Sequence, residues 1–287
     1  MQIRKLGKLV PGPLKPLAKK AWVVLTVRIN PNPILVLGNQ KSGTSAIAAL
    51  LAEMTGLSIT IDLKSQINYP TYNQVYKGEL SFSEFINNNR LDFSRDIIKE
   101  PNLTILHQEL IEYFPRSKFV FVLRDPRDNI RSILDRLKLP GNLPGLKQEH
   151  WAKIPPAWKL ILDCRWLGLE GENYIELLAA RWSFMADVFL KSQDKMRLIC
   201  YEDFLKDKIG EITRLSQDLE LKQVNDIADK VDIPFQPPGN RNVKWIEFFG
   251  HDNLACIDRI CCQNMKQLGY LPSSQGQAYG ADNAKNL

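Results

Sequence analysis

The stretch that decides the fold is "ILVLGNQKSGTSAIAALLAEM", residues 34–54, in which a short apolar run leads into a loop with two glycines. After the loop, apolar residues recur at i, i+3, i+4 and i+7, which predicts a helix with one buried face: Ile47, Leu50, Leu51 and Met54. Strand, glycine loop and helix in this order are the setting of a phosphate-binding loop, because the helix N-terminus directs free N–H groups and a partial positive charge at the loop.

The loop differs from that of a nucleoside triphosphatase in the position of its lysine. Such enzymes place a lysine directly after the second glycine and an acidic residue at a strand end that helps to hold Mg²⁺. Here Thr44 follows Gly43, Lys41 lies inside the loop, and neither "DIIKE" nor "KFVFVLR" ends in four apolar residues followed by Asp. Ser42 and Ser45 add hydroxyl donors. The loop is predicted to bind a phosphate without ATP chemistry; the alternative is a plain glycine turn between strand and helix.

Apolar runs and helical patterns alternate along the rest of the chain. The runs "ILVLG", "DIIKE", "KFVFVL" and "RLICY" are separated by segments of helical periodicity. This alternation predicts an α/β fold: a three-layer domain of the P-loop type with a central parallel β-sheet flanked by helices. We place the folded domain at residues 31–272. Residues 140–171 are rich in Pro, Gly and Trp, and a connection of that length predicts a substrate-side insertion or lid.

Charge and apolar content separate the two ends from the domain. The net charge of +6 is concentrated in residues 1–30, a basic N-terminal arm with seven Lys or Arg and no acidic residue, so the remainder is near neutral and does not suggest nucleic-acid binding. "AWVVLTV", residues 21–27, is far shorter than the roughly 18–20 residues of a membrane span, which leaves two interpretations: an arm on its own domain or a peripheral membrane contact. The polar residues 273–287 are predicted to be a disordered tail.

The cysteines indicate a reducing compartment. The chain has five cysteines, none in a C-x-x-C pair, and only three histidines, so neither a disulfide framework nor a zinc cluster is expected. We interpret the cysteines as mostly buried core residues and expect a cytoplasmic protein.

A second strand–helix junction, "KFVFVLRDPRDNIRSIL" at residues 118–134, carries another anion-binding pattern. Asp125 is a natural N-cap and Pro126 suits the first helical turn. Arg124 then lies at the carboxyl end of a strand, where ligands of open α/β sheets bind, and Ser132 lies off the apolar face of the helix. An arginine that binds phosphate bidentately and a hydroxyl together predict a second phosphate site. Taken alone, the same residues are typical of a capped, solvated turn.

Together the two motifs resemble the sulfotransferases that use 3′-phosphoadenosine 5′-phosphosulfate (PAPS). That family places a K-S-G-T-[ST] loop around the 5′-phosphosulfate and an R-[DN]-P-[RK]-D-x-x-x-S pattern around the 3′-phosphate. Both occur here, at residues 41–45 and 124–132, and the resemblance continues in "RWSFMADVFL", "LICYEDFLKD" and "GNRNVKWIEFFG" to about residue 270.

The resemblance implies a set of donor-binding residues. The 5′-phosphosulfate would be bound by Lys41, Ser42, Gly43, Thr44 and Ser45. Lys41 would also stabilise the leaving oxygen, which with the helix N–H groups makes a metal unnecessary. Arg124 and Ser132 would bind the 3′-phosphate, and Arg241, in a looser match to a late basic loop, would close that site. We interpret residues 201–203, Tyr-Glu-Asp, as a structural strand end that leads into a helix.

The general base does not follow from the resemblance in the same way. Cytosolic members use the His of a K-T-H motif, and in Lys99-Glu100-Pro101 the proline takes its place. Other members use a Glu some twenty residues past the loop, for which the corresponding carboxylate here is Asp62. Asp62 and Glu100 therefore remain the two candidates. Lys99 would contact the sulfuryl group or the acceptor, and His107 is interpreted as a helix surface residue.

The implied function is transfer of a sulfuryl group from PAPS to a hydroxyl or amine by in-line displacement. A carbohydrate or lipid is the expected acceptor, because Trp151, Trp158 and Trp166 in the insertion offer an aromatic face; the alternative is a buried helical hairpin. Two other functions stay open: a non-catalytic 3′,5′-ADP-binding or membrane-docked protein on the same scaffold, and a P-loop kinase of small molecules, against which the position of Lys41 argues.

Overall fold

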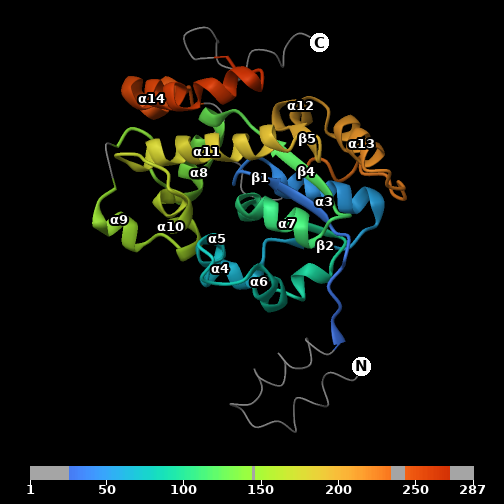
Figure 1. Ribbon diagram of the computed structural model, residues 1–287. Helices are drawn as coiled ribbons and strands as arrows, with labels where there is room; N and C mark the ends of the chain where they lie inside the picture. The colour runs from blue at the N-terminus through green and yellow to red at the C-terminus, as the bar shows by residue number, and fades with distance from the viewer. Residues whose placement is uncertain (1–25, 144–145, 234–242, 272–287) are drawn as a thin grey trace.

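The computed structural model of the protein describes residues 26–143, 146–233 and 243–271 (Figure 1). Most of the basic arm, two residues of the 140–171 insertion, Arg241 and the whole of the 273–287 tail lie outside the described residues. The domain boundaries therefore stay predictions.

The centre of the molecule is a five-stranded, all-parallel sheet in the order β2-β3-β1-β4-β5. The register pairs Ile34 of β1 with Ile97 of β3 on one side and with Lys118 of β4 on the other. This confirms the predicted α/β fold with a central parallel sheet. The strands are β1 Ile34–Gly38, β2 Ile59–Ile61, β3 Ile97–Lys99, β4 Lys118–Leu123 and β5 Met196–Cys200.

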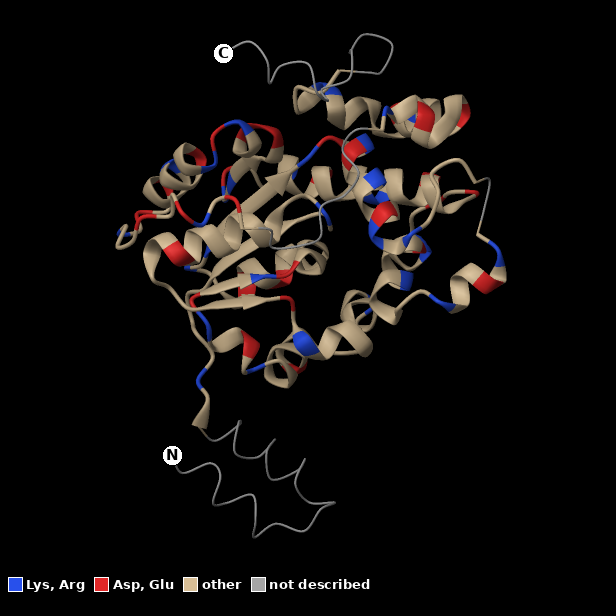
Figure 2. Cartoon of the chain, turned by 180° about the vertical axis from the view of Figure 1, so that it is seen from behind, with Lys and Arg blue, Asp and Glu red and all other residues tan. Residues whose placement is uncertain are grey.

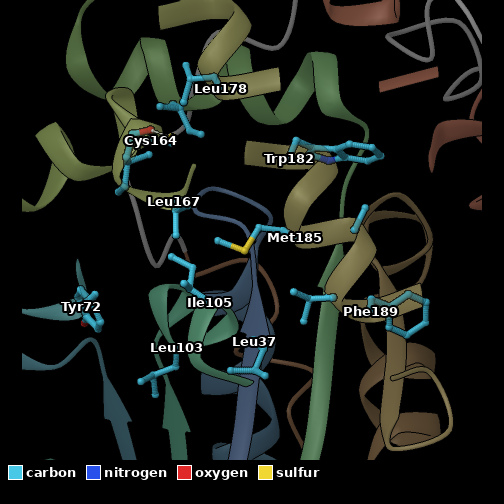
Figure 3. Packing of buried hydrophobic residues seen from close by; sticks show 14 of the residues in the cluster. Leu37, Tyr72, Leu103, Ile105, Cys164, Leu167, Leu178, Trp182, Met185 and Phe189 are labelled. Atoms are coloured by element: carbon cyan, nitrogen blue, oxygen red, sulfur yellow. Dashed lines mark hydrogen bonds between the residues drawn. The ribbon is translucent and has the colours of Figure 1, made fainter. Parts of the chain in front are cut away.

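Helices cover both faces of the sheet, which explains the continuous apolar runs of the strands. Successive side chains of a strand point to opposite faces, so Leu35 and Leu37 belong to one core cluster and Ile34 and Val36 to another. Figure 3 shows Leu37 facing Met185 and Ile105 in the first cluster.

The first cluster lies under α11 and α8, with α14 packed outside α11 (Figure 1). The second lies under α3 and α13. In Figure 2 the strands are almost entirely uncharged, and basic and acidic residues gather on the surrounding loops and helices. The longer helices are α3 Thr44–Thr55, α8 Pro126–Leu137, α11 Tyr174–Lys191, α13 Lys208–Asp218 and α14 Trp245–Gln267, the last interrupted at Gly250.

Short helices fill the connections between the strands and the longer helices. The insertion forms α9 and α10 and packs its three tryptophans, partly buried, against the first core cluster. Within the described parts of the chain, every helix is too short or too polar to cross a bilayer. The short elements are α4 Lys64–Asn68, α5 Tyr72–Tyr76, α6 Phe82–Asn88, η2 Asp92–Ser94, η3 Pro101–Leu106, α7 His107–Tyr113, α9 Gln148–Ala152, α10 Pro156–Leu162, η4 Cys164–Leu167 and α12 Tyr201–Lys206.

The strand order fixes where a ligand can bind. The chain runs from β1 outward to β2, returns to β3, and then continues on the other side of β1 with β4 and β5. The order thus reverses at β1, and in open α/β sheets the crevice beyond the carboxyl ends of the strands at such a point is the usual ligand site. The loops after β1 and β4 both open there, and these loops carry the two predicted anion-binding motifs.

Candidate active site

A cleft of about 680 Å³ lies beyond the carboxyl ends of the strands. Its lining comes from the loop after β1, the start of α12, the outer face of α8, the segment after β3, and α4 and α10. Nearly all predicted site residues within the described chain line it: Lys41, Gly43, Thr44, Ser45, Asp62, Lys99, Glu100, Arg124 and Ser132. Ser42, in the same loop, is buried and does not line the cleft.

The backbone of the loop after β1 requires glycine at one position. Gly43 has φ 93°, and a Cβ atom there would lie 2.2 Å from Cδ2 of Tyr201. Lys41 also has a positive φ, 67°. A non-glycine residue in this conformation is uncommon and persists only where the surroundings hold it. Here the loop is held by the buried side-chain amides of Asn39 and Asn129 and by Arg124.

Asn129 of α8 holds the loop from behind. Its Nδ2 donates to the carbonyl oxygen of Gln40 at 2.7 Å and to Oγ of Ser42 at 3.0 Å, and its Oδ1 accepts from Asn39 Nδ2 at 2.9 Å. Asn129 is fully buried. The two sequence motifs are therefore one unit: the helix of the second motif supplies the residue that shapes the loop of the first. The sequence did not show that Asn129, near the polar start of α8, would be buried.

The ammonium of Lys41 lies partly buried among other cations. Burial, followed by the charges of Arg136, Arg124 and Lys99, lowers its pKa to about 8, and Asp135 acts in the opposite direction. Arg136 also lines the cleft, one helical turn beyond Ser132, and was not singled out from the sequence. Such a concentration of positive charge favours an anionic ligand.

Arg124 joins the loop to the cleft wall. Its Nη1 donates to the carbonyl oxygen of Lys41 at 2.8 Å, and its guanidinium lies over the ring of Tyr201, 4.6 Å from the centroid. Its backbone carbonyl accepts from Trp182 Nε1 at 2.9 Å. Its Nε is buried and makes no hydrogen bond to the described residues.

The segment Tyr201–Asp203 has two roles. Glu202 is structural: Oε1 accepts from the backbone N–H of Asp125 at 2.9 Å and Oε2 from the hydroxyl of Tyr270 at 2.9 Å, and burial raises its pKa. Tyr201, in contrast, lines the cleft and closes over Gly43. The sequence interpretation of this segment as structural therefore misses Tyr201, which no motif marked as a cleft residue.

At the other end of the cleft, Asp62 and Lys99 form an ion pair. Lys99 Nζ lies 2.5 Å from Asp62 Oδ1, and the backbone N–H of Asp62 donates to the carbonyl of Lys99 at 2.9 Å. The Lys99 side chain is 4% exposed and that of Asp62 is 41% exposed. Asp62 has φ 58°, so its carboxylate is held at a fixed turn next to the cleft.

Glu100 lies beside this pair but is bound differently. Its Oε2 accepts from the backbone N–H of Leu63 at 3.2 Å and its Oε1 from that of Asn102 at 3.0 Å. Burial raises its pKa, the charge of Asp62 acts in the same direction, and Lys99 opposes them. Tyr72 brings a buried hydroxyl next to Glu100, and that oxygen makes no hydrogen bond of normal geometry to the described residues.

Pro101 lines the cleft at the place of the K-T-H histidine. His107 begins α7 as a half-buried residue, not a fully exposed one, and burial lowers its pKa. Within the described residues, no cluster of three or more His, Cys, Asp or Glu side chains forms a metal-binding group.

Part of the cleft wall is apolar. Trp158 and Ile161 of α10 and Ile67 of α4 line the cleft, and α10 packs beside α4. Trp166 is a supporting residue: its Nε1 donates to the carbonyl of Leu160 at 2.9 Å and its ring packs edge-on against Tyr76. Of the three tryptophans, only Trp158 therefore lines the cleft.

Comparison with solved structures gives the same fold. A sulfotransferase from Alicyclobacillus acidocaldarius superposes with a TM-score of 0.51 at 13% identity, covering 85% of this chain and 98% of that one. The sulfotransferase STF9 from Mycobacterium avium gives 0.50 at 11% identity, covering 90% and 82%. The mouse sulfotransferase SULT7A1, complexed with PAP, gives 0.50 at 16% identity, covering 85% and 88%. No curated protein sequence matches the chain.

A family model described as the sulfotransferase domain matches residues 31–234, which is most of the chain. The matched residues contain both anion-binding motifs, all five strands and most of the cleft. The chain therefore belongs to the sulfotransferase domain family.

Proposed function

We propose that this sulfotransferase moves a sulfuryl group from PAPS to a hydroxyl or amine of its acceptor. The observation that carries the proposal is that Lys41 after β1, Arg124 after β4 and Ser132 of the following helix α8 line one cleft. A donor with phosphates at both its 5′ and 3′ positions needs two separate sets of cationic and hydroxyl groups. The N-terminus of α3, which begins directly after the loop without a side-chain cap, fits such an anion.

The donor end follows from these positions. Residues 41–45 would hold the 5′-phosphosulfate, and Arg124 with Ser132 would hold the 3′-phosphate. The donor supplies the sulfuryl group. Lys41 and the N–H groups at the start of α3 would stabilise the charge on the leaving oxygen, so we expect chelation by EDTA to leave the rate unchanged. The role of Arg241 stays a prediction, because it lies outside the described residues.

At the acceptor end we assign the general base to Asp62. Its side chain is 41% exposed next to the cleft, and Lys99 fixes it through Oδ1. Glu100 is buried, and both of its oxygens accept backbone N–H groups, so it orders the segment after β3. Asp62 would take the proton of the attacking hydroxyl or amine, a step worth roughly 10²- to 10⁴-fold in rate. Lys99 would contact the sulfuryl group as it moves.

The lining favours a lipid alcohol over a carbohydrate as acceptor. Ile67, Trp158 and Ile161 give the acceptor end an apolar wall. Gln66, a polar residue on this side, is already engaged, since its Oε1 accepts from the N–H and hydroxyl of Thr71. A sugar requires several free hydrogen-bonding groups, whereas an alcohol on an apolar body requires one base and an apolar wall.

Label transfer from radioactive PAPS tests the proposal. Purified protein is incubated with labelled PAPS and either a long-chain alcohol or a monosaccharide, with and without EDTA. We expect transfer to the alcohol that EDTA does not affect and that Lys41→Ala and Arg124→Ala each abolish. Arg214→Ala, on the exposed side of α13, is the matched control and should keep full activity.

Other outcomes identify the remaining functions. Binding of 3′,5′-ADP without turnover on any acceptor would indicate a non-catalytic protein. Phosphate transfer from Mg·ATP would indicate a kinase. A cytoplasmic location and membrane contact through residues 1–30 stay predictions, which vesicle binding by the full and the truncated chain can decide.

A further inference from the structure

A fully buried arginine lies behind the phosphate-binding loop. Arg181 comes from α11, whose residues Leu178 and Trp182 are labelled in the core in Figure 3. Its Nε donates to Asn39 Oδ1 at 3.3 Å, and its Nη2 donates to Gln40 Oε1 at 2.9 Å and to Asn102 Oδ1 at 3.1 Å.

These partners belong to both ends of the cleft. Asn39 and Gln40 directly precede Lys41 in the donor loop, whereas Asn102 follows Glu100 at the acceptor end and gives its backbone N–H to that carboxylate. Gln40 Nε2 also donates to Asn102 Oδ1 at 2.7 Å, so the amides form a closed group around the guanidinium. One side chain thus connects the two segments whose relative position sets the distance between donor and acceptor.

The charge of Arg181 has no carboxylate partner. Among the described residues no acidic side chain lies within ion-pair distance of it, and its buried Nη1 makes no hydrogen bond to them. Arg127, the comparable buried arginine, lies 2.6 Å from Asp125 and 3.5 Å from Asp258. Burial lowers the pKa of Arg181, and the Cys164 thiol and Glu100 act in the opposite direction. A buried cation held by neutral groups, without a carboxylate within ion-pair distance among the described residues, is an unfavourable arrangement for the empty protein.

The loop conformation depends on the same group of amides. Asn39 accepts a hydrogen bond from Arg181 and donates one to Asn129. Asn129 in turn donates to the carbonyl of Gln40 and to the hydroxyl of Ser42. Moving Arg181 would therefore change the orientation of groups that line the donor site, although Arg181 itself does not line the cleft.

We propose that Arg181 is a positioning residue for sulfuryl transfer. It holds the donor loop and the segment after Glu100 in one arrangement, and its unpaired charge is offset by the anionic donor when the donor binds. The inference rests on the proposed function, which assigns an anion to the loop. A consequence follows: removing the charge should weaken anion binding more than it weakens the empty fold.

The test compares Arg181→Gln, which keeps hydrogen-bond donors and loses the charge, with Arg181→Lys, which keeps the charge. Calorimetry measures the Kd of 3′,5′-ADP, and thermal unfolding measures the ligand-free Tm. We expect the Gln variant to raise the Kd by about tenfold or more and to leave the ligand-free Tm equal or higher. The Lys variant should recover most of the affinity. Because the charge is buried, the ratio of the Kd values of the Gln variant and wild type should persist in about 0.5 M salt.

Leu178→Ala, on the same helix, is the matched control. It removes buried apolar volume, so it should lower the Tm and leave the Kd of 3′,5′-ADP unchanged. Arg181 would be merely structural, and the proposal wrong, if the Gln variant behaved like Leu178→Ala or failed to fold, or if the Lys variant bound no better than the Gln variant.

Failure of the proposed function is distinguishable from failure of this inference. If wild type does not bind 3′,5′-ADP, the assignment of PAPS as the donor is wrong. Pyrophosphate, a small anion suited to a phosphate loop, then measures the same ratio of Kd values between wild type and the Gln variant. A ratio near one would overturn the role of Arg181, and a ratio of about ten would support it without PAPS.

Discussion

The partly buried ammonium of Lys41 should make donor binding depend on pH between 7 and 9. Its pKa is lowered from 10.5 to about 8, first by burial and then by neighbouring guanidinium groups. Only the protonated form attracts an anion, so the apparent Kd rises by the factor 1 + 10^(pH − pKa). That factor is about 1.1 at pH 7 and about 11 at pH 9, which predicts roughly a tenfold loss of affinity.

The ligand contributes little to this change. The second pKa of a phosphate monoester lies near 6, so the charge of 3′,5′-ADP is nearly constant over the range. Calorimetry with 3′,5′-ADP from pH 6.5 to about 9.5 measures the slope, and Lys41→Arg is the control, because a guanidinium does not titrate in this range and its affinity should stay flat.

The ligand-free protein should show the opposite slope. Because the pKa of Lys41 is lower in the folded than in the unfolded state, its protonated form destabilises the fold. This penalty is complete below the folded pKa of about 8 and disappears as the pH rises toward 10.5. Relative to Lys41→Met, wild type should therefore gain stability with pH while losing affinity. A flat wild-type Kd up to pH 9, or the same slope in Lys41→Arg, would refute this reasoning.

Four substitutions test other parts of the cleft. Gly43→Ala should abolish stabilisation by 3′,5′-ADP, because its Cβ would lie 2.2 Å from the Tyr201 ring, and an unchanged Kd would contradict the loop geometry. Asp62→Asn should lower kcat by roughly 10²- to 10⁴-fold and leave donor affinity unchanged. Glu100→Gln should mainly lower the Tm, because it removes charge-assisted hydrogen bonds. The reverse pattern would make Glu100 the base. Trp158→Ala should raise the KM for an apolar acceptor and leave that for PAPS unchanged; an unaffected acceptor KM would remove α10 from the acceptor site.

The parts of the site that sequence could predict are those built from consecutive residues. The strand, loop and helix of each motif, β1 with α3 and β4 with α8, follow from apolar periodicity and capping residues within about twenty positions. Lys41, Arg124 and Ser132 are placed by these local signals, and the structure brings all three to one cleft.

The residues that sequence reasoning missed depend on contacts between distant elements. Arg181 contacts Asn39 across 142 positions, and Tyr201 closes over Gly43 only because β5 pairs with β4. The strand order is itself a result of helix packing on both faces, which a single sequence does not encode locally. The choice between Asp62 and Glu100 likewise needed structure, because burial and backbone partners distinguish two otherwise similar carboxylates.

A thermal-unfolding titration with 3′,5′-ADP, 5′-ADP and Mg·ATP tests the central claim most directly. Two phosphate sites in one cleft predict that 3′,5′-ADP stabilises the protein most. At about 100 times its Kd it should add roughly 2.7 kcal/mol, a shift of roughly 5 °C that Arg124→Ala removes. Equal stabilisation by 5′-ADP would mean that Arg124 and Ser132 bind no 3′-phosphate, and stabilisation by Mg·ATP alone would contradict PAPS as the donor.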